Sequence, residues 1–297
     1  MISTASAPPA DSLRERPMHA HAEQVMGTVV SFAVLPGELT DADLRSAVRA
    51  ACAILHDADA VFSTWDPRSP LSRLRRGEVL AGDLPSGMAE VLALCETARE
   101  ASGGWFDPWA LPGGYDPTGL VKGWAVDHAL SALCQAGIPA AMVNGGGDLA
   151  AYGSPAPGRP WRAGIRHPWR AAALAAVVEV HGAVATSGGY ERGAHLVDPH
   201  TRLPDCRAAS ATVTGPSLAM TDALATALAV GGDPALEAVE GLAGYEGYLI
   251  RPDGTEACSS GMAFAASPDE APAPGQAAAP GQAPGQAPGP DQAPWPD

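Results

Sequence analysis

The stretch SLAMTDALATALAVGG, residues 217–232, has the length and composition of one buried helix. Leucine, methionine and alanine fill it, and Gly231-Gly232 at its end is a typical helix stop. Asp222 is its only charged residue, and Thr226 follows four positions later on the same helical face. A lone carboxylate in an apolar helix is costly unless a base, backbone donors or a metal ion pairs with it.

Two interpretations of this pair are open from the stretch alone. The Asp222 carboxylate and the Thr226 hydroxyl are two hard oxygen ligands one turn apart, which suits Mg²⁺ or Ca²⁺ better than Zn²⁺. Alternatively, Asp222 faces solvent and Thr226 bonds back to its own helix.

The composition excludes several classes of protein. The chain has 297 residues, 46% of them hydrophobic, which suffices for a sizeable core in one large domain or two small ones. A formal net charge of −15 argues against binding to nucleic acid or acidic membranes, since phosphates would repel the chain. Without a run of 18 apolar residues we expect no membrane insertion. The N-terminal stretch shows neither an apolar signal segment nor a lipid-carrying cysteine, so we expect a cytoplasmic location.

The five cysteines are widely spaced and form no CxxC pair. They are Cys52, Cys95, Cys134, Cys206 and Cys258. We interpret them as small buried hydrophobes in a reducing compartment, not as disulfides or a zinc site.

Lys122 is the only lysine among 18 basic residues. It lies in DPTGLVKGWAVD, residues 116–127, in the first turn of a helix predicted from near Gly119 to about Gln135. A cation there opposes the helix dipole unless an anion is near, and helix N-termini bind phosphate. A phosphate-bearing ligand would explain Lys122, Gly119 and Gly123 together, and a snorkelling surface lysine is the alternative.

The order of predicted elements favours an α+β fold with a single catalytic domain. Residues 1–20 are predicted to be a disordered arm and residues 267–297 a disordered Pro/Gly/Ala/Gln-rich tail, which leaves 21–266 as the folded domain. Hydrophobic periodicity predicts helices and strands without a steady βαβ alternation. The predicted helices are 41–62, one capped by Ser86, 119–135, 217–232 and one from Pro234; the predicted strands include 23–35, 161–166, 174–181, 184–187 and 211–214.

A third stretch with polar groups is ATSGGYERGAHLVDPHTRLP, residues 185–204. Thr186 and Ser187 end a predicted strand before two glycines, so their hydroxyls and amides can contact a ligand. His195 follows, and histidine is the natural proton carrier near neutral pH, although a single histidine beside an apolar pair is more often structural. NGGGD at 144–148 is a glycine turn that lacks the GxGxxG of a dinucleotide site.

Eight motifs, taken in order, resemble the ApbE family of Mg²⁺-dependent FAD:protein FMN transferases over about residues 23–250. They are MGT at 26–28, FSTW at 62–65, WFDP at 105–108, D-x-x-G-x-x-KG-x-x-x-D at 116–127, VNGGGD at 143–148, TSGGY at 186–190, HLVDP-x-T at 195–201 and the D-x-x-x-T of the first helix described above.

The resemblance implies mixed, mainly antiparallel sheets with packed helices. It implies that FAD is a substrate, that Mg²⁺ is a cofactor, and that FMN passes to a Thr or Ser hydroxyl of an acceptor protein with a D-x-x-[ST]-G-[AS]-T type motif, releasing AMP. The alternatives are a Mg²⁺-dependent FAD pyrophosphatase, which would give FMN and AMP, and a non-catalytic FAD-binding protein.

The resemblance also implies roles for individual residues. The metal ligands would be Asp222, Thr226 and the Gly119 carbonyl, and the catalytic residues His195, Lys122 and Asp222. The FAD contacts would be Met26, Trp65, Trp105, Phe106, Asp107, Asp116, Lys122, Thr186, Ser187 and Leu196. The sequence departs from the family in three places: Trp65 replaces the usual Tyr, Arg202 replaces the usual Gly, and the segment from Asp107 to Asp116 is short.

Overall fold

The structure, a computed structural model, describes residues 17–79, 84–111, 113–189 and 196–265. Most of the predicted N-terminal arm, the predicted tail and His195 lie outside these residues. Within the four described ranges, no helix has both the length and the apolar character that a membrane crossing requires.

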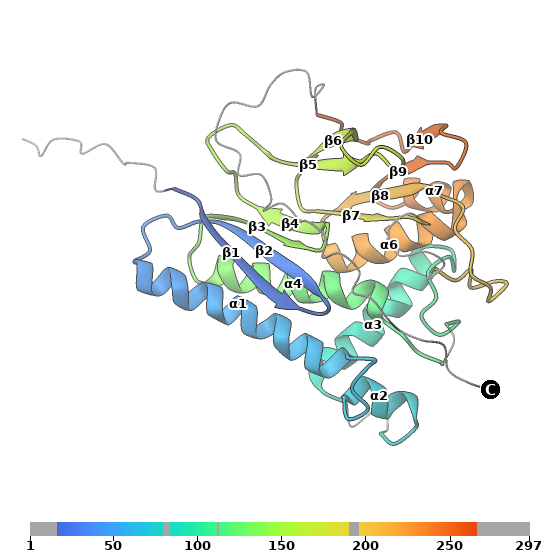
Figure 1. Ribbon diagram of the computed structural model, residues 1–297, viewed down its shortest axis with the longest axis horizontal. Helices are drawn as coiled ribbons and strands as arrows, with labels where there is room; N and C mark the ends of the chain where they lie inside the picture. The colour runs from blue at the N-terminus through green and yellow to red at the C-terminus, as the bar shows by residue number, and fades with distance from the viewer. Residues whose placement is uncertain (1–16, 80–83, 112, 190–195, 266–297) are drawn as a thin grey trace, which may run out of the picture. The chain divides into compact units, whose positions relative to one another are not determined.

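An eight-stranded antiparallel sheet organises the fold, with strand order β1-β2-β3-β4-β7-β8-β9-β10 (Figure 1). Its strands are β1 His19–Val25, β2 Thr28–Leu35, β3 Ala140–Gly145, β4 Asp148–Tyr152, β7 Ala183–Ser187, β8 Ser210–Gly215, β9 Glu246–Ile250 and β10 Glu256–Cys258. Strands β5 (Trp161–Arg166) and β6 (Leu174–Val180) form a separate antiparallel pair.

Helices cover one face of the large sheet, and the β5–β6 pair lies on the other face (Figure 1). The helices are α1 Asp41–Phe62, α2 Pro70–Arg75, α3 Ser86–Ala101, α4 Thr118–Gln135, α6 Leu218–Gly231 and α7 Asp233–Glu240. Strand β2 shows why two cores result. Val30, Phe32 and Val34 point toward the helices, while Ala33 and Leu35 pack against the core under β5 and β6, because successive side chains of a strand face opposite ways.

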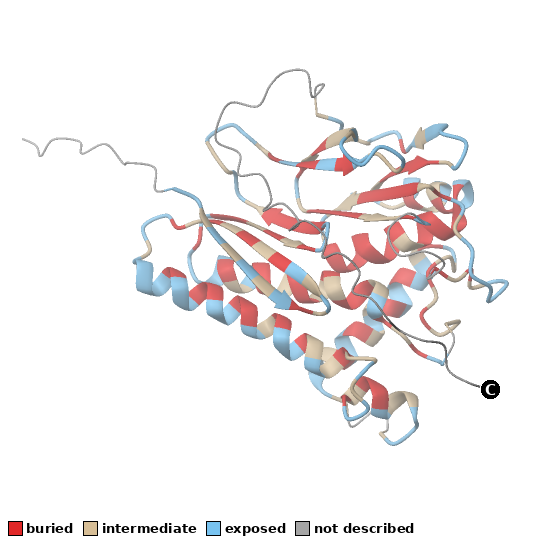
Figure 2. Ribbon diagram, in the orientation of Figure 1, coloured by how far each residue is buried: buried red, intermediate tan, exposed pale blue. Residues whose placement is uncertain are grey.

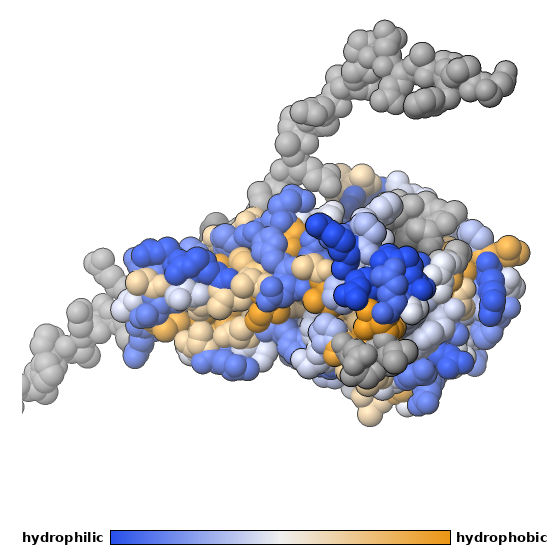
Figure 3. Space-filling view, turned by 90° about the horizontal axis from the view of Figure 1, so that it is seen from below, coloured by the Kyte–Doolittle hydropathy of each residue, from blue (hydrophilic) through white to orange (hydrophobic). Residues whose placement is uncertain are grey.

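Burial differs between the helices as their sequences predict (Figure 2). Nearly every residue of α6 is buried, whereas α1 buries one face, with Leu44, Val48 and Leu55 among its buried residues. Seen from the helix side, the surface mixes hydrophilic and apolar residues (Figure 3). Because nearly all of its residues are buried, helix α6 lies at the centre of the helical layer.

The predicted α+β class is confirmed, and the helix expected at 41–62 has these bounds. The single strand expected at 23–35 is wrong: the segment is the β1–β2 hairpin. Met26 and Gly27 have φ of 53° and 67° and form its two-residue turn, which reverses the chain. Strand β1 begins at His19, inside the predicted arm, because it pairs with β2 along its whole length.

Two smaller expectations are also wrong. Ser86 is the first residue of α3, and Pro85 occupies the N-cap position without a side-chain bond. All five cysteines are free, but Cys134 and Cys258 are exposed. Cys134 lies within the helical pattern of α4 but on a face that the core does not cover, next to the buried Leu133.

Candidate functional site

The candidate site lies where α4 crosses α6 at close range. A Cβ on Gly123 would lie 2.6 Å from the carbonyl carbon of Leu218 and 2.8 Å from the nitrogen of Ala219, so glycine permits this approach. One turn further along α4, the Asp127 carboxylate accepts hydrogen bonds from the Leu218 and Ala219 nitrogens at 3.0 Å each and from the Ser217 hydroxyl at 3.0 Å. A side chain of α4 therefore caps the N-terminus of α6.

This crossing buries Asp222, which is 5% exposed. Among the described residues its Oδ2 atom has no hydrogen-bond partner, and the Lys122 Nζ lies 3.6 Å from that oxygen. Burial raises the pKa of Asp222 to about 7; Lys122 opposes this rise and the Asp148 carboxylate adds to it. A solvent-facing Asp222 is therefore the wrong interpretation. Its buried oxygen, which has no hydrogen bond within the described part of the chain, is a position that a further cation would stabilise.

Asp148 is a site residue that the sequence analysis missed. It is 5% exposed, forms an ion pair with Lys122, and accepts a hydrogen bond from the Thr186 nitrogen at 2.8 Å. The sequence carried a signal, because Asp148 is the acidic residue directly after the glycine turn at 144–147. The Lys122 stem lies beside that turn, with its Cγ 3.7 Å from a Cβ placed on Gly145.

The Lys122 side chain is only 24% exposed, so a snorkelling surface lysine is also a wrong interpretation. Helix α4 begins at Thr118, which places Lys122 in its second turn. Asp148 supplies the anion that the helix-dipole argument requires, so this argument alone no longer calls for a phosphate.

Oxygen groups of the expected metal ligands gather on neighbouring elements. The Thr226 Oγ1 lies 3.4 Å from the Ser187 Oγ at the end of β7. A Cβ on Gly119, in the first turn of α4, would lie 3.7 Å from the same Thr226 hydroxyl. Mg²⁺ prefers hard oxygen ligands, and this part of the structure offers the Asp222 carboxylate, the Thr226 and Ser187 hydroxyls and the backbone of Gly119, so the residues present fit this ion.

Of three expected aromatic FAD contacts, Phe106 borders this cluster, Trp105 contacts the C-terminal end of α6, and Trp65 does neither. Phe106 is buried, and its ring lies 3.3 Å from a Cβ placed on Gly119. The guanidinium carbon of Arg207 lies over the Trp105 ring, 4.8 Å from the ring centre. A Cβ on Gly231 of α6 would clash with the same indole. Trp65 is 93% exposed and so makes little contact with the protein.

Two acidic residues that were expected to contact FAD form ion pairs with arginines. Asp107 pairs with Arg99 at 3.3 Å, and Asp116 pairs with Arg75 at 3.6 Å. Asp116 also accepts a hydrogen bond from the Thr118 nitrogen at 3.1 Å, which fixes the start of α4. Through these contacts, Asp107 and Asp116 hold the loop between α3 and α4 in place.

Met26 and Leu196, two apolar residues that were expected to contact FAD, lie in different parts of the fold. Met26 has a left-handed backbone at the tip of the β1–β2 hairpin, a conformation that is strained for a residue with a side chain. The neighbouring Thr28 hydroxyl would lie 2.7 Å from a Cβ on Gly146, so this tip lies beside the glycine turn. Leu196 is buried in the helical core.

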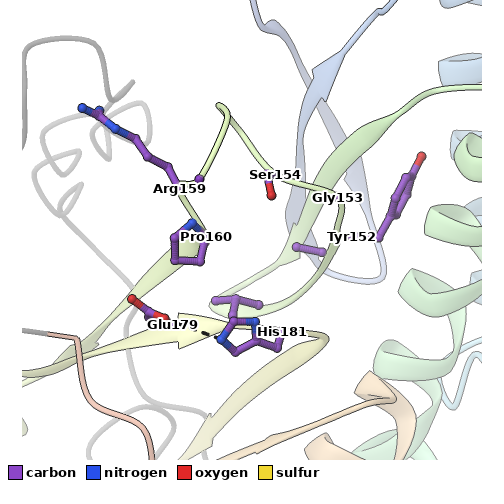
Figure 4. Close-up of a pocket in the computed structure, with 10 residues that line it drawn as sticks. Tyr152, Gly153, Ser154, Arg159, Pro160, Glu179 and His181 are labelled. Carbon is purple, nitrogen blue, oxygen red and sulfur yellow. Dashed lines mark ion pairs between the residues drawn. The ribbon is translucent and has the colours of Figure 1, made fainter.

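A separate cavity of about 520 Å³ lies where β4 ends and the β5–β6 pair begins (Figure 4). Among the residues around it are Tyr152, Arg159 and Glu179, and Glu179 pairs with His181 at 3.6 Å. The cavity contains none of the residues gathered around Asp222. Buried charge, not cavity size, therefore identifies the candidate site.

Comparison with known sequences decides the family. The sequence model of the ApbE family matches residues 26–112 and 114–249, most of the chain. The chain belongs to the ApbE family. This confirms the resemblance found in the eight motifs.

Curated ApbE relatives share part of the chain. The FAD:protein FMN transferase of Salmonella typhimurium is 33% identical over 144 residues, covering 45% of this chain and 41% of that protein. The FAD:protein FMN transferase of Haemophilus influenzae is 36% identical over 171 residues, covering 52% of this chain and 49% of that protein. The chain therefore spans less than half the length of these relatives.

Solved ApbE structures share the fold. The flavin transferase ApbE from Vibrio cholerae superposes with a TM-score of 0.70 at 22% identity, covering 82% of this chain and 98% of that one. The ApbE protein from Thermotoga maritima gives a TM-score of 0.69 at 21% identity, covering 82% and 97%. At this level of identity the likeness concerns the fold alone.

One turn in this chain departs from the usual ApbE sequence and has a left-handed backbone. Arg202, at the position of the usual Gly, has φ of 60°, and its nitrogen donates to the Asp198 carbonyl at 2.7 Å. The buried Asp198 carboxylate accepts a hydrogen bond from the His200 nitrogen at 2.8 Å. The left-handed backbone at Arg202 is strained, because the residue carries a side chain.

Proposed function

We propose that this chain transfers FMN from FAD to a Thr or Ser hydroxyl of an acceptor protein and releases AMP. Mg²⁺ would be held by the Asp222 carboxylate, the Thr226 hydroxyl and the Gly119 carbonyl. The observation that carries the proposal is the buried Asp222 oxygen, which has no hydrogen-bond partner within the described ranges and lies 3.6 Å from the Lys122 ammonium. The names of the curated relatives supply the reaction class.

The proposed reaction exchanges one phosphate bond for another. The acceptor hydroxyl oxygen bonds to the phosphorus of the FMN half, the bond from that phosphorus to the AMP phosphate breaks, and AMP leaves. The hydroxyl proton passes to a base, and we assign this role to His195. The alternative role for His195 is to bind a phosphate. When bound, Mg²⁺ neutralises charge on the pyrophosphate.

Lys122 serves this chemistry through its fixed position. Its ammonium is held between the Asp148 and Asp222 carboxylates, so it cannot turn away to solvent. Positioned charge accounts for most catalysis of phosphoryl transfer, because the protein forms few bonds of its own to the reacting group. Asp148 is therefore proposed to orient Lys122, and the partnership of the two is part of the site.

The test is incubation with FAD and Mg²⁺, with and without a peptide of the D-x-x-[ST]-G-[AS]-T type. A flavin-mass adduct on the peptide is expected. Free FMN and AMP without adduct would support the pyrophosphatase alternative, and unchanged FAD would support simple binding and refute catalysis.

Variants connect that assay to the site. Asp222→Ala should abolish the adduct at ordinary Mg²⁺ concentration, whereas Glu237→Ala removes an exposed carboxylate of α7 and should leave it intact. Lys122→Arg should lower the rate by on the order of 10²-fold, because a planar guanidinium cannot take the place of the ammonium between two carboxylates. Full activity of Asp222→Ala would refute the metal assignment.

A further inference from the structure

A second group of ligand-type side chains lies between β1 and α1. His21 and Glu23 are two positions apart on one face of β1, and Cys52 and His56 are one turn apart on α1. The His21 Nε2 lies 3.2 Å from one Glu23 oxygen, and the His56 Nε2 lies 2.8 Å from the other. One ligand atom each of His21, Glu23 and Cys52 lies within 4.8 Å of the other two.

We propose that His21, Glu23 and Cys52 bind a Zn²⁺ ion and that His56 positions Glu23 through its second oxygen. Tetrahedral Zn²⁺, with bonds of about 2.0 Å to nitrogen and 2.3 Å to sulfur, separates its ligand atoms by roughly 3.5 Å. Atoms that already lie within 4.8 Å of one another reach that spacing through side-chain movement alone. Thiolate and imidazole ligands favour Zn²⁺ over Mg²⁺, so this site differs chemically from the one at Asp222.

Burial at this cluster is graded from solvent to core. The His21 and Glu23 side chains are 36% and 28% exposed, whereas Cys52 is 7% exposed. An ion can therefore enter from solvent and meet the thiol at the base of the cluster. Burial, with a contribution from Glu23, raises the pKa of the Cys52 thiol to about 11, so the metal-free thiol is protonated at neutral pH. On binding, the Zn–S bond replaces the S–H bond and the proton leaves to solvent.

The ion would connect an edge of the sheet to a helix. Strand β1 is one of the two edge strands of the large sheet, and among the described strands its neighbour is β2. Zn²⁺ held by two residues of β1 and one of α1 would link that strand to α1 directly. No CxxC pair marks the site in the sequence, because its ligands lie on two different elements and Glu23 and Cys52 are 29 positions apart.

The full-length protein, treated with EDTA and dialysed, is titrated with Zn²⁺ by calorimetry and with Co²⁺ by absorption spectroscopy. We expect one Zn²⁺ per chain at micromolar metal, and a thiolate-to-cobalt absorption band in the near ultraviolet. Millimolar Mg²⁺ should not displace the ion. Absence of saturable Zn²⁺ binding at micromolar metal would overturn the proposal.

Variants locate the ion. Cys52→Ser should eliminate the cobalt band, and His21→Ala should weaken Zn²⁺ binding by about 100-fold or more, because an outer-shell change alone has effects of about 10- to 100-fold. His56→Ala should weaken it by about tenfold. The matched control Cys134→Ser removes an exposed thiol of α4 and should leave affinity and spectrum unchanged, as should Asp222→Ala.

Circular dichroism distinguishes a variant that has lost a Zn²⁺ ligand from a variant that has unfolded. Each variant is measured without metal, and its helical signal should match that of the wild-type chain. Glu23→Gln, which keeps the side-chain shape but removes the charge, gives a second variant that does not depend on Cys52. Unchanged Zn²⁺ affinity in both Cys52→Ser and Glu23→Gln would overturn the assignment of these ligands.

Discussion

Replacing Gly123 by Ala should destabilise the protein, although the same change in an open helix stabilises it. Alanine in a helix interior is favoured over glycine by about 1 kcal/mol. At Gly123 the new Cβ would lie 2.6 Å from the Leu218 carbonyl carbon, and ordinary contact begins at 3.4 Å. The start of α6 must therefore retreat by at least the difference, 0.8 Å, since the Leu218 carbonyl oxygen lies closer still. The obstructing atoms belong to backbone, so rotation of a side chain cannot relieve the clash.

The retreat has two measurable consequences. Overpacking of a well-packed core typically costs about 1–3 kcal/mol, and weakening of the Asp127 cap adds about 1 kcal/mol. After the helix-propensity gain, the net loss is about 1–3 kcal/mol of unfolding free energy, or a fall in Tm of about 2–12 °C. Because Lys122 and Asp222 lie on the two separated helices, we also expect flavin transfer to slow by on the order of 10²-fold.

The measurement is urea unfolding followed by circular dichroism, together with the flavin-adduct assay. Gly241→Ala is the matched control, because Gly241 has φ of −76° and a Cβ there would lie 3.5 Å from the Ala238 carbonyl oxygen. This change should be neutral or stabilise by up to about 1 kcal/mol. A Gly123→Ala variant as stable and as active as the wild-type chain would refute close helix contact as the basis of the site.

Three further predictions concern other parts of the fold. Asp127→Ala should lower the unfolding free energy by about 1–2 kcal/mol, because it removes the cap of α6, and an unchanged urea midpoint would contradict that role. Arg202→Gly should raise stability by up to about 1 kcal/mol, since relief of left-handed strain exceeds the entropy of glycine in the unfolded chain; a lower Tm than that of Arg202→Ala would contradict it. In EDTA at pH 8, iodoacetamide should modify the exposed Cys134 and Cys258 well before Cys52. The pKa of Cys52, raised to about 11, leaves little thiolate until the pH approaches that value. Equal labelling of the three cysteines in peptide mass spectrometry would contradict this prediction.

Local patterns were sufficient for most of the fold. The apolar spacing of α1 predicted its bounds because an amphipathic helix encodes its buried face at every turn. The hairpin turn at Met26 and Gly27 was missed because methionine is an unusual residue at positive φ, so the sequence showed no ordinary turn signal. The exposure of Cys134 was missed because an apolar residue within a helix does not reveal how far the core extends over it.

The candidate site shows the division most clearly. The sequence by itself determined that α6 is a buried helix with one carboxylate, that Lys122 is the only lysine, and that the chain resembles the ApbE family. Only the tertiary structure decided that Asp148 pairs with this lysine and that Asp127 caps α6, since both contacts join residues far apart in the chain. Helical and strand periodicity report which face of one element is buried, whereas partners across elements depend on how closely two backbones approach, and at Gly123 a missing Cβ sets that distance.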